Sequence, residues 1–397
     1  MGNLLYDTLS GRRVARAPSV PKIWLDLACN LLEREYLHMF SDPEYAALTV
    51  VEAAVLCRCD GARVFLYPRK DVRIGEDGVY RHFNGSTCLG KVDIAGGWAT
   101  QFEDPGQIDL TDAQTIINYS FFRSPHPIIK GIEELERIRL PKLNEYHELY
   151  DQIVQHAVEA AQGKLCPIGD CNSGTLAFCV SLLGMSGALL AMVDEPAFVH
   201  SLMDIGTELS ITQAKFFIDQ GIRVLRYNDS PANMKVISPQ MWREYIGPRI
   251  RLFCEEVHKY CPEARVYCHI CGNIMPVLED LCGSGLDCIG LLDPLGCEPV
   301  WKIRQMVGEQ VNLMGGVNTL SFIEKTPEKV REEARFCIQG GFRQGHYVIG
   351  SGCVIPRAAS KESIEALRLA SEDMEEESIG ETIVGSSRPY GYTADRR

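Results

Sequence analysis

The sequence lacks any stretch rich in lysine and arginine. Acidic residues predominate, since 53 Asp and Glu stand against 40 Lys and Arg and give a formal net charge of −13. A protein that binds nucleic acid neutralises phosphates with clustered cationic side chains, so this composition argues against DNA or RNA as a partner. Internal repeats and low-complexity tracts are also absent. With 46% hydrophobic residues, the composition is that of an ordinary soluble protein.

An apolar signal core is absent from residues 1–16, and a single long run, residues 174–193, carries no charge. A run of this length is enough to cross a bilayer. It contains Gly184 and Gly187, however, and its flanks are acidic, with Asp170 before it and Asp194 after it, rather than basic. We therefore expect a buried helix of the fold and no membrane contact.

The sixteen cysteines exclude little by themselves. A small secreted chain with so many would have a disulfide framework, but 397 residues can form a large core without one. We expect free thiols in the reducing cytoplasm of a cell with anaerobic metabolism.

Short apolar runs rich in β-branched residues alternate with longer helical patterns, which is typical of parallel βα units. Eight such runs are present, and eight parallel strands close a barrel. The predicted fold class is α/β, a (β/α)8 TIM barrel with an N-terminal arm before Pro21. The expected strands span residues 20–26, 62–68, 164–170, 223–229, 264–270, 286–293, 311–316 and 346–351.

One segment, residues 71–102, departs from this alternation and has an antiparallel β pattern around a turn at residues 75–78. A β-hairpin inserted there, after strand 2, would lie over the C-terminal mouth of the barrel and could act as a lid. We expect a single domain over residues 1–375, followed by a polar C-terminal tail at residues 376–397.

Several residues suited to chemistry fall at the C-terminal ends of the expected strands, the face on which barrel enzymes build their active sites. His269 and Cys271 are two residues apart and therefore share one face of their strand. Cys353 follows Gly350 and Gly352, which let the backbone turn toward that pair. One imidazole and two thiolates are ligands that zinc prefers, and three protein ligands leave a fourth position open. We predict a catalytic zinc site.

Simpler interpretations exist for each of these residues. A buried cysteine is common as a small apolar side chain, and a lone histidine is often a hydrogen-bonded core group. Among the polar candidates, Asn228 and Asp229 are the predicted catalytic or substrate-contacting residues, with Asp229 passing a proton to the leaving group. Asp26, Asp170 and Asp293 are predicted to contact the substrate. Asp170 and Asp293 would serve equally well as helix caps or ion-pair partners.

Three segments resemble the uroporphyrinogen decarboxylase superfamily, in particular its zinc-dependent corrinoid methyltransferase branch. They are HICGN at residues 269–273, GGVNT at 315–319 and GSGCVIP at 350–356. Weaker likeness, in SPHP at 124–127 and in Ser238-Pro239, extends the resemblance over about residues 71–369. The decarboxylase branch has an arginine-rich N-terminal substrate motif, and the basic segment at residues 12–16 lacks that pattern.

The resemblance implies zinc held by His269, Cys271 and Cys353, and transfer of a methyl group to or from the cobalt of a corrinoid protein. No corrinoid-binding Asp-x-His-x-x-Gly motif is present, because Tyr267 stands two residues before His269. The corrinoid (cobalamin) is therefore expected to arrive on a partner protein. The preferred direction is from a small-molecule methyl donor, such as a methoxylated aromatic undergoing O-demethylation, to cob(I)alamin.

Other functions stay open at this point. The enzyme could instead be a methylcorrinoid:thiol methyltransferase of the coenzyme M type, or a zinc-free decarboxylase or lyase on the same barrel. A binding module whose zinc only braces the barrel mouth is a third interpretation. The sequence leaves the oligomeric state open, and a homodimer is compatible with it.

Overall fold

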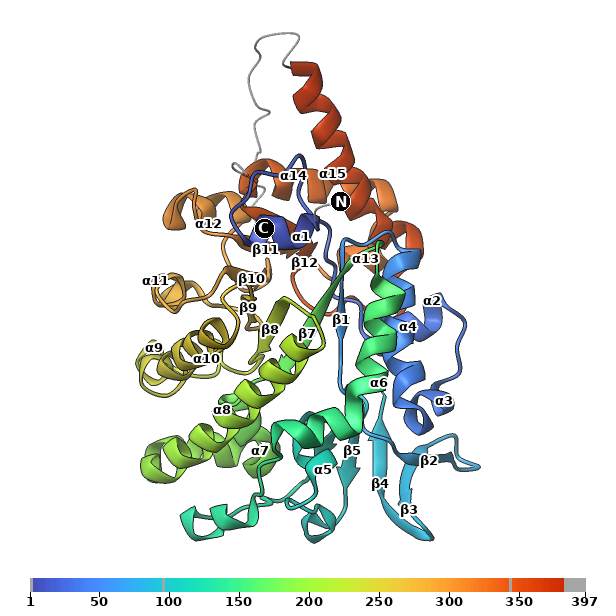
Figure 1. Ribbon diagram of the computed structural model, residues 1–397, viewed down its shortest axis with the longest axis vertical. Coiled ribbons are helices and arrows are strands. Elements are labelled where there is room, and N and C mark those ends of the chain that lie inside the picture. The colour runs from blue at the N-terminus through green and yellow to red at the C-terminus, as the bar shows by residue number, and fades with distance from the viewer. Residues whose placement is uncertain (1–2, 95–96, 343–344, 382–397) are drawn as a thin grey trace.

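The computed structural model describes residues 3–94, 97–342 and 345–381. Seven parallel strands form its central, curled sheet in the order β1-β7-β8-β9-β10-β11-β12 (Figure 1). Six of them agree with an expected strand to within two residues at both ends, and β1 begins within one residue of the expected start but ends four residues early. Seven of the eight are therefore confirmed, together with the α/β barrel-like fold. These strands are β1 (Gly61–Val64), β7 (Cys166–Asn172), β8 (Val224–Asn228), β9 (Arg265–His269), β10 (Cys288–Leu292), β11 (Leu313–Val317) and β12 (Tyr347–Ser351).

The eighth expected strand, residues 20–26, is wrong. Ser19 and Lys22 form isolated bridges to the β12 side of the sheet, and the chain then enters helix α2 (Leu25–Leu31). The carbonyl of Ser19 also accepts a hydrogen bond from the residue just before β1. Pro18 and Pro21 have no N–H to donate to a ladder, which is why this segment bridges the gap between β12 and β1 without becoming a regular strand.

Helices follow the strands and surround the sheet (Figure 1). Ser238 caps a helical segment by accepting a hydrogen bond from the backbone N–H of Met241. The segment passes through a π-helical turn before α10. The larger helices are α4 (Pro43–Leu56), α6 (Leu143–Ala161), α7 (Leu176–Asp194), α8 (Pro196–Asp219), α10 (Gly247–Tyr260), α12 (Val300–Val307), α14 (Pro327–Gly341) and α15 (Lys361–Glu381). The shorter ones are α1 (Leu4–Leu9), α3 (Tyr36–Ser41), α5 (Ala113–Ile117), α9 (Pro239–Met241), α11 (Leu278–Cys282) and α13 (Ser321–Glu324).

The uncharged run identified in the sequence is helix α7. Within the described residues it is the one helix long and apolar enough to cross a membrane, but half of its apolar window is buried inside the protein. Its N-terminal turn packs against α8, where an added Cβ on Gly174 would lie 2.2 Å from the backbone of Gly206. At Gly184 the backbone has φ +73° and kinks the helix. Beyond the kink, Leu190 and Val193 are exposed.

Between β1 and β7 the chain forms a second, five-stranded sheet of order β2-β3-β4-β5-β6. As expected, β2 and β3 are antiparallel across the turn at residues 75–78. Lys70 anchors this sheet, because its buried Nζ donates to Trp98 O, Thr100 Oγ1 and Phe121 O at 3.0, 3.1 and 3.0 Å. The strands are β2 (Asp71–Ile74), β3 (Tyr80–Asn84), β4 (Thr87–Asp93), β5 (Ala99–Phe102) and β6 (Phe122–Arg123). In Figure 1 this sheet lies at the end of the molecule opposite α14 and α15.

The interior of the barrel changes from apolar to polar along the strands. Leu5 and Leu9 of α1 belong to an apolar cluster inside the barrel, together with Ile168 of β7 and Val224 of β8. Two residues further along β8 on the same face comes Arg226, which is 1% exposed. Because side chains two apart share a strand face, the polar residues gather at the C-terminal ends of the strands. That end of the barrel is where a site can form.

Candidate metal centre

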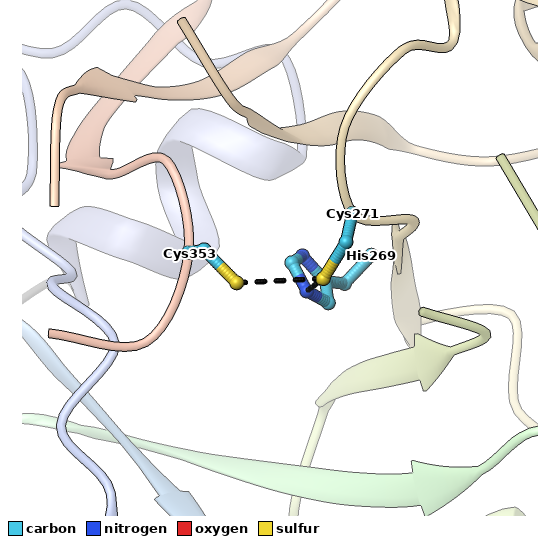
Figure 2. Close-up of side chains that lie close together, drawn as sticks. All are labelled: His269, Cys271 and Cys353. Carbon is cyan, nitrogen blue, oxygen red and sulfur yellow. Dashed lines mark hydrogen bonds between the residues drawn. The ribbon is translucent and has the colours of Figure 1, made fainter. Parts of the chain in front are cut away.

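Three ligand-type side chains converge at the strand ends (Figure 2). His269 is the last residue of β9, Cys271 follows it by two, and Cys353 lies two residues beyond β12. The Nε2 atom of His269 lies 3.1 Å from Cys271 Sγ, and the sulfurs of Cys271 and Cys353 are 3.4 Å apart. All three ligand atoms lie within 4.8 Å of one another. The structure thus brings together the three residues that the sequence predicted as a metal set.

Close backbone packing holds the Cys271 loop in place. Gly272 has φ +72°, a conformation that favours glycine. A Cβ added to Gly296, in the loop after β10, would lie 2.5 Å from the Cα of Gly272. Both positions therefore require glycine for this approach of the two loops. Cys271 is fixed by the loop after β10 as well as by its own strand.

A buried serine ties the Cys353 loop to the eighth position of the barrel. Ser351 Oγ accepts a hydrogen bond from the backbone N–H of Lys22 at 2.9 Å. The same hydroxyl donates to the carbonyl of Cys353 at 2.7 Å. The turn that carries Cys353 is therefore held against the segment that closes the barrel.

The side chains of His269 and of Cys268 lie on opposite faces of strand β9. His269 is fully buried, and Cys271 and Cys353 are partly exposed. Cys268, which precedes His269 on β9, belongs to the core outside the barrel, and burial raises its pKa well above the ordinary value of a thiol. Cys268 therefore faces away from the site, as the alternation of the strand predicts.

Lys22 is a member of this site that was not predicted. Its Nζ lies 2.9 Å from Nε2 of His269, and the residue is 6% exposed. Burial, followed by the charge of Arg226, lowers the pKa of Lys22 to about 7. The signal was available in the sequence, because Lys22 is a cation within an apolar run.

The electrostatics of the cluster favour neutral imidazole and available sulfur. Burial, followed by the charge of Lys22, lowers the pKa of His269 well below its ordinary value. A hydrogen bond from Cys271 lowers the pKa of Cys353, and the same bond raises that of Cys271. One proton is thus shared between the two sulfurs. A neutral imidazole and two sulfurs of which one is readily ionised form a donor set that fits zinc.

A pocket of about 310 Å³ opens beside the cluster. It combines charged and amide side chains from the strand ends with aromatic side chains, and the second sheet forms part of its wall. The lining residues are Lys22, Trp24, Asp26, Phe65, Leu66, Gly97, Ser120, Phe121, Arg123, Asp170, Asn172, Gln213, Arg226, Asn228 and Val354. Three of the predicted substrate-contacting residues, Asp26, Asp170 and Asn228, therefore face one cavity.

Asp170 lies in a buried charge network. Arg226 Nη1 donates to Asp170 Oδ1 at 2.7 Å, and Arg226 Nη2 donates to Asn228 Oδ1 at 2.6 Å. Arg63 Nη1 lies 3.7 Å from Asp170 Oδ2. The ion-pair interpretation of Asp170 is therefore correct, and it coexists with a place in the pocket wall. Arg63 and Arg226 were not singled out from the sequence, although each is a cation within an apolar strand.

Asp229 and Asp293 lie elsewhere. The carboxylate of Asp229 is fully buried and caps helix α7, where it accepts hydrogen bonds from Leu176 N at 3.2 Å, Ala177 N at 2.9 Å and the Thr175 hydroxyl. The side chain of Asp293 accepts from a backbone N–H two residues further on, at 3.0 Å. Neither is among the residues that line the pocket. A proton-transfer role for Asp229 would require the start of α7 to move.

A sequence model of the family described as uroporphyrinogen decarboxylase (URO-D) matches residues 122–373, which is more than half of the chain. The matched region includes all three candidate ligands. It begins at β6, so most of the second sheet precedes it.

Relatives with described activities include two methyltransferases and a decarboxylase. The uroporphyrinogen decarboxylase of Dictyostelium discoideum is 28% identical over 210 residues, 50% of this chain and 54% of that protein. The methylated-thiol–coenzyme M methyltransferase of Methanosarcina mazei is 27% identical over 173 residues, 43% of this chain and 44% of that protein. A methylcobamide:CoM methyltransferase of Methanosarcina barkeri is 22% identical over 240 residues, 60% of this chain and 65% of the relative. The chain thus spans less than two thirds of the length of any of these relatives. A solved methyltransferase structure from Methanosarcina mazei, 18% identical, matches with a TM-score of 0.70 over 94% of this chain and 98% of the other, so the two share a fold.

Proposed function

Because this chain belongs to the uroporphyrinogen decarboxylase (URO-D) family, we propose that it is a zinc-dependent methyltransferase of the family's corrinoid branch. It takes a methyl group from a small molecule, such as a methoxylated aromatic, and passes it to the cob(I)alamin of a partner corrinoid protein in an anaerobic cytoplasm. One observation carries this assignment: His269 Nε2, Cys271 Sγ and Cys353 Sγ lie within 4.8 Å of one another, next to a pocket at the strand ends. The described activities of the two methyltransferase relatives support methyl transfer in general, and not a particular methyl donor.

The three ligands have distinct tasks in this proposal. His269 supplies a neutral nitrogen, because burial keeps its ring unprotonated. Cys271 and Cys353 give up their shared proton when they bind a cation. When bound, zinc supplies a Lewis acid that withdraws charge from a methyl ether oxygen or lowers the pKa of a thiol at the position that the ligands leave open.

The remaining residues of the pocket hold and orient the substrate. Asn228 has its side-chain oxygen engaged by Arg226, so its NH₂ group is left to donate to a substrate oxygen. Asp170 is held by the same guanidinium and presents a fixed polar surface. Asp26 lines the pocket from helix α2, and burial raises the pKa of its carboxyl group. It is the best-placed group to pass a proton to the leaving group, a task that the sequence had suggested for Asp229.

A second direction of transfer is favoured by a specific observation. The two methyltransferase relatives act with coenzyme M, a thiol, according to their names. The same metal set would then bind a thiol substrate, and the methyl group would travel from a methylated corrinoid partner to that sulfur. Both directions use the same three ligands and the same pocket.

The metal assignment is tested by metal analysis of purified variants. The wild-type protein should contain about one zinc ion per chain, and Cys353→Ser should lose most of it while remaining folded. Cys297→Ser is a matched control, because Cys297 is also partly exposed and its sulfur bonds to the carbonyl of Gly272. Wild-type protein without stoichiometric metal would favour a zinc-free decarboxylase. Unfolding of Cys353→Ser, with loss of circular dichroism, would favour a zinc that only braces the barrel mouth.

The reaction is tested by following cobalamin spectra. Conversion of cob(I)alamin to methylcobalamin in the presence of a methoxylated aromatic supports the preferred direction. Demethylation of methylcobalamin by thiols, together with inactivity toward every ether, amine and alcohol, would reverse it. Either activity should disappear in Cys353→Ser and persist in Cys297→Ser.

A further inference from the structure

Arg123 is a cation in the pocket wall that forms no ion pair within the described part of the chain. Its Nη1 donates to Ser120 O at 2.9 Å and to Phe122 O at 2.8 Å, and it lies 3.5 Å from Ser181 Oγ. All three acceptors are uncharged. Within the described part of the chain no carboxylate forms an ion pair with Arg123. Burial lowers the pKa of this guanidinium from its ordinary value, and the nearby Tyr119 and Asp93 oppose that shift without cancelling it.

The other charged groups of the pocket do not balance this cation. Arg226 and Arg63 both pair with Asp170, so two positive charges share a single negative charge. The lining contains Arg123 and Arg226 against Asp26 and Asp170. Arg63 beside Asp170 is a third guanidinium, so the excess does not depend on Lys22, whose pKa is about 7. The pocket is therefore a site of positive excess in a chain whose formal net charge is −13. A partly buried cation that forms no ion pair among the described residues and lies at a cavity wall indicates an anionic ligand.

The remaining wall of the pocket is aromatic. Trp24 and Phe65 line it and pack edge to face, with ring centroids 4.7 Å apart, and Phe121 lies nearby in the same lining. Aromatic side chains bind flat rings through offset and edge-to-face contacts. Lys22, which contacts His269, and Val354, which follows Cys353, also line this cavity, so part of its wall adjoins the candidate metal centre.

We propose that Arg123 is a specificity-determining residue that binds the carboxylate or sulfonate of the substrate, and that the substrate is a small aromatic acid whose methoxy group reaches the metal centre. This assignment rests on the proposed function and adds the class of its substrate. An aliphatic thiol sulfonate shares the anionic group but offers no ring for Trp24, Phe65 and Phe121. The anion accounts for the unpaired guanidinium, and the ring accounts for the aromatic wall.

The test measures binding to the metal-loaded protein by calorimetry, with no corrinoid partner present. Two pairs of probes differ in charge: 4-methoxybenzoate against methoxybenzene, and 2-mercaptoethanesulfonate against 2-mercaptoethanol. Wild-type protein should bind 4-methoxybenzoate at least tenfold more tightly than methoxybenzene and more tightly than either thiol. Arg123→Gln should lose most of that preference for charge, whereas Arg123→Lys should retain part of it. Arg137→Gln is the control, because Arg137 is exposed and pairs with Glu134 instead of lining the pocket.

Each outcome decides one part of the assignment. Equal weakening of charged and neutral probes by Arg123→Gln would mean that Arg123 only supports the loop, and an unchanged preference for charge would remove it from the site. Loss of charge preference for the thiol pair alone would keep the anion site and overturn the aromatic substrate. If Arg123→Gln does not fold, Arg123→Lys decides. The assignment would also be overturned if its preference for the charged probe over the neutral one equalled that of wild type, or if that preference were absent. Charge-dependent binding without any methyl transfer would leave this site standing and refute the proposed function instead.

Discussion

Replacing Asp229 should destabilise the fold and leave methyl transfer intact. Its carboxylate accepts hydrogen bonds from the N–H groups of Leu176 and Ala177 and from the hydroxyl of Thr175, at the N-terminus of helix α7. In Asp229→Ala the two backbone donors lose their partners, and each unsatisfied buried donor costs about 1–3 kcal/mol. The Thr175 hydroxyl is spared, because it lies 3.1 Å from the Tyr227 hydroxyl.

The net loss is smaller than the sum of these penalties. Wild-type protein already bears a cost for burying this group, since burial raises the pKa of Asp229. We expect a free energy of unfolding lower by about 3 kcal/mol in Asp229→Ala, and by about 1–2 kcal/mol in Asp229→Asn, which keeps one acceptor. As a comparison, Asp42→Asn alters an exposed cap on helix α4 and should cost about 0.5–1 kcal/mol.

Urea unfolding followed by circular dichroism measures these differences, and the cobalamin assay measures methyl transfer at a temperature where each variant is folded. A general acid or base contributes about 10²–10⁴-fold to a rate. Asp229→Asn with wild-type stability and a rate reduced to that extent would refute the capping role. It would restore the proton-transfer role that the sequence suggested.

Two further predictions concern the anchor of the second sheet and the Cys271 loop. Burial, followed by the charge of Arg123, lowers the pKa of Lys70 to about 7 from an ordinary value of 10.5, so the unfolded chain binds more protons than the folded one between these pH values. The free energy of unfolding, measured by urea unfolding, should therefore rise with pH across this window, by at most about 1.4 kcal/mol per pH unit from this group. Lys70→Met should lack that rise. Parallel pH profiles of the two proteins would contradict the prediction. In Gly296→Ala the new Cβ would lie 2.5 Å from the Cα of Gly272, so the Cys271 loop should shift. Zinc affinity, measured by chelator competition, should then fall by about 10–100-fold. An affinity equal to that of wild type would show that the two loops separate without moving the sulfur of Cys271.

The barrel strands were predictable because each is a short apolar run bounded by breaks in the pattern. The metal set was predictable for a related reason, since His269, Cys271 and Cys353 all follow such runs, and parallel strands of one sheet end on one side. Residues 20–26 failed because their apolar pattern suits a strand, whereas Pro18 and Pro21 cannot supply ladder donors. The pattern of apolar residues indicates which side chains are buried. It does not indicate whether the backbone can form the hydrogen bonds that pair it with a neighbouring strand.

The sequence by itself determined the order of seven barrel strands, the faces of those strands and the identity of the three candidate metal ligands, because alternation and spacing are local properties of the chain. Tertiary structure alone decided the partners of the polar groups. It placed Lys22 against His269, and it left Arg123 at the pocket wall with no ion pair to any described carboxylate. It turned Asp229 away from the pocket to cap α7. The partners of Lys22 and Asp229 are far away in the sequence, so the local spacing of residues does not reveal them.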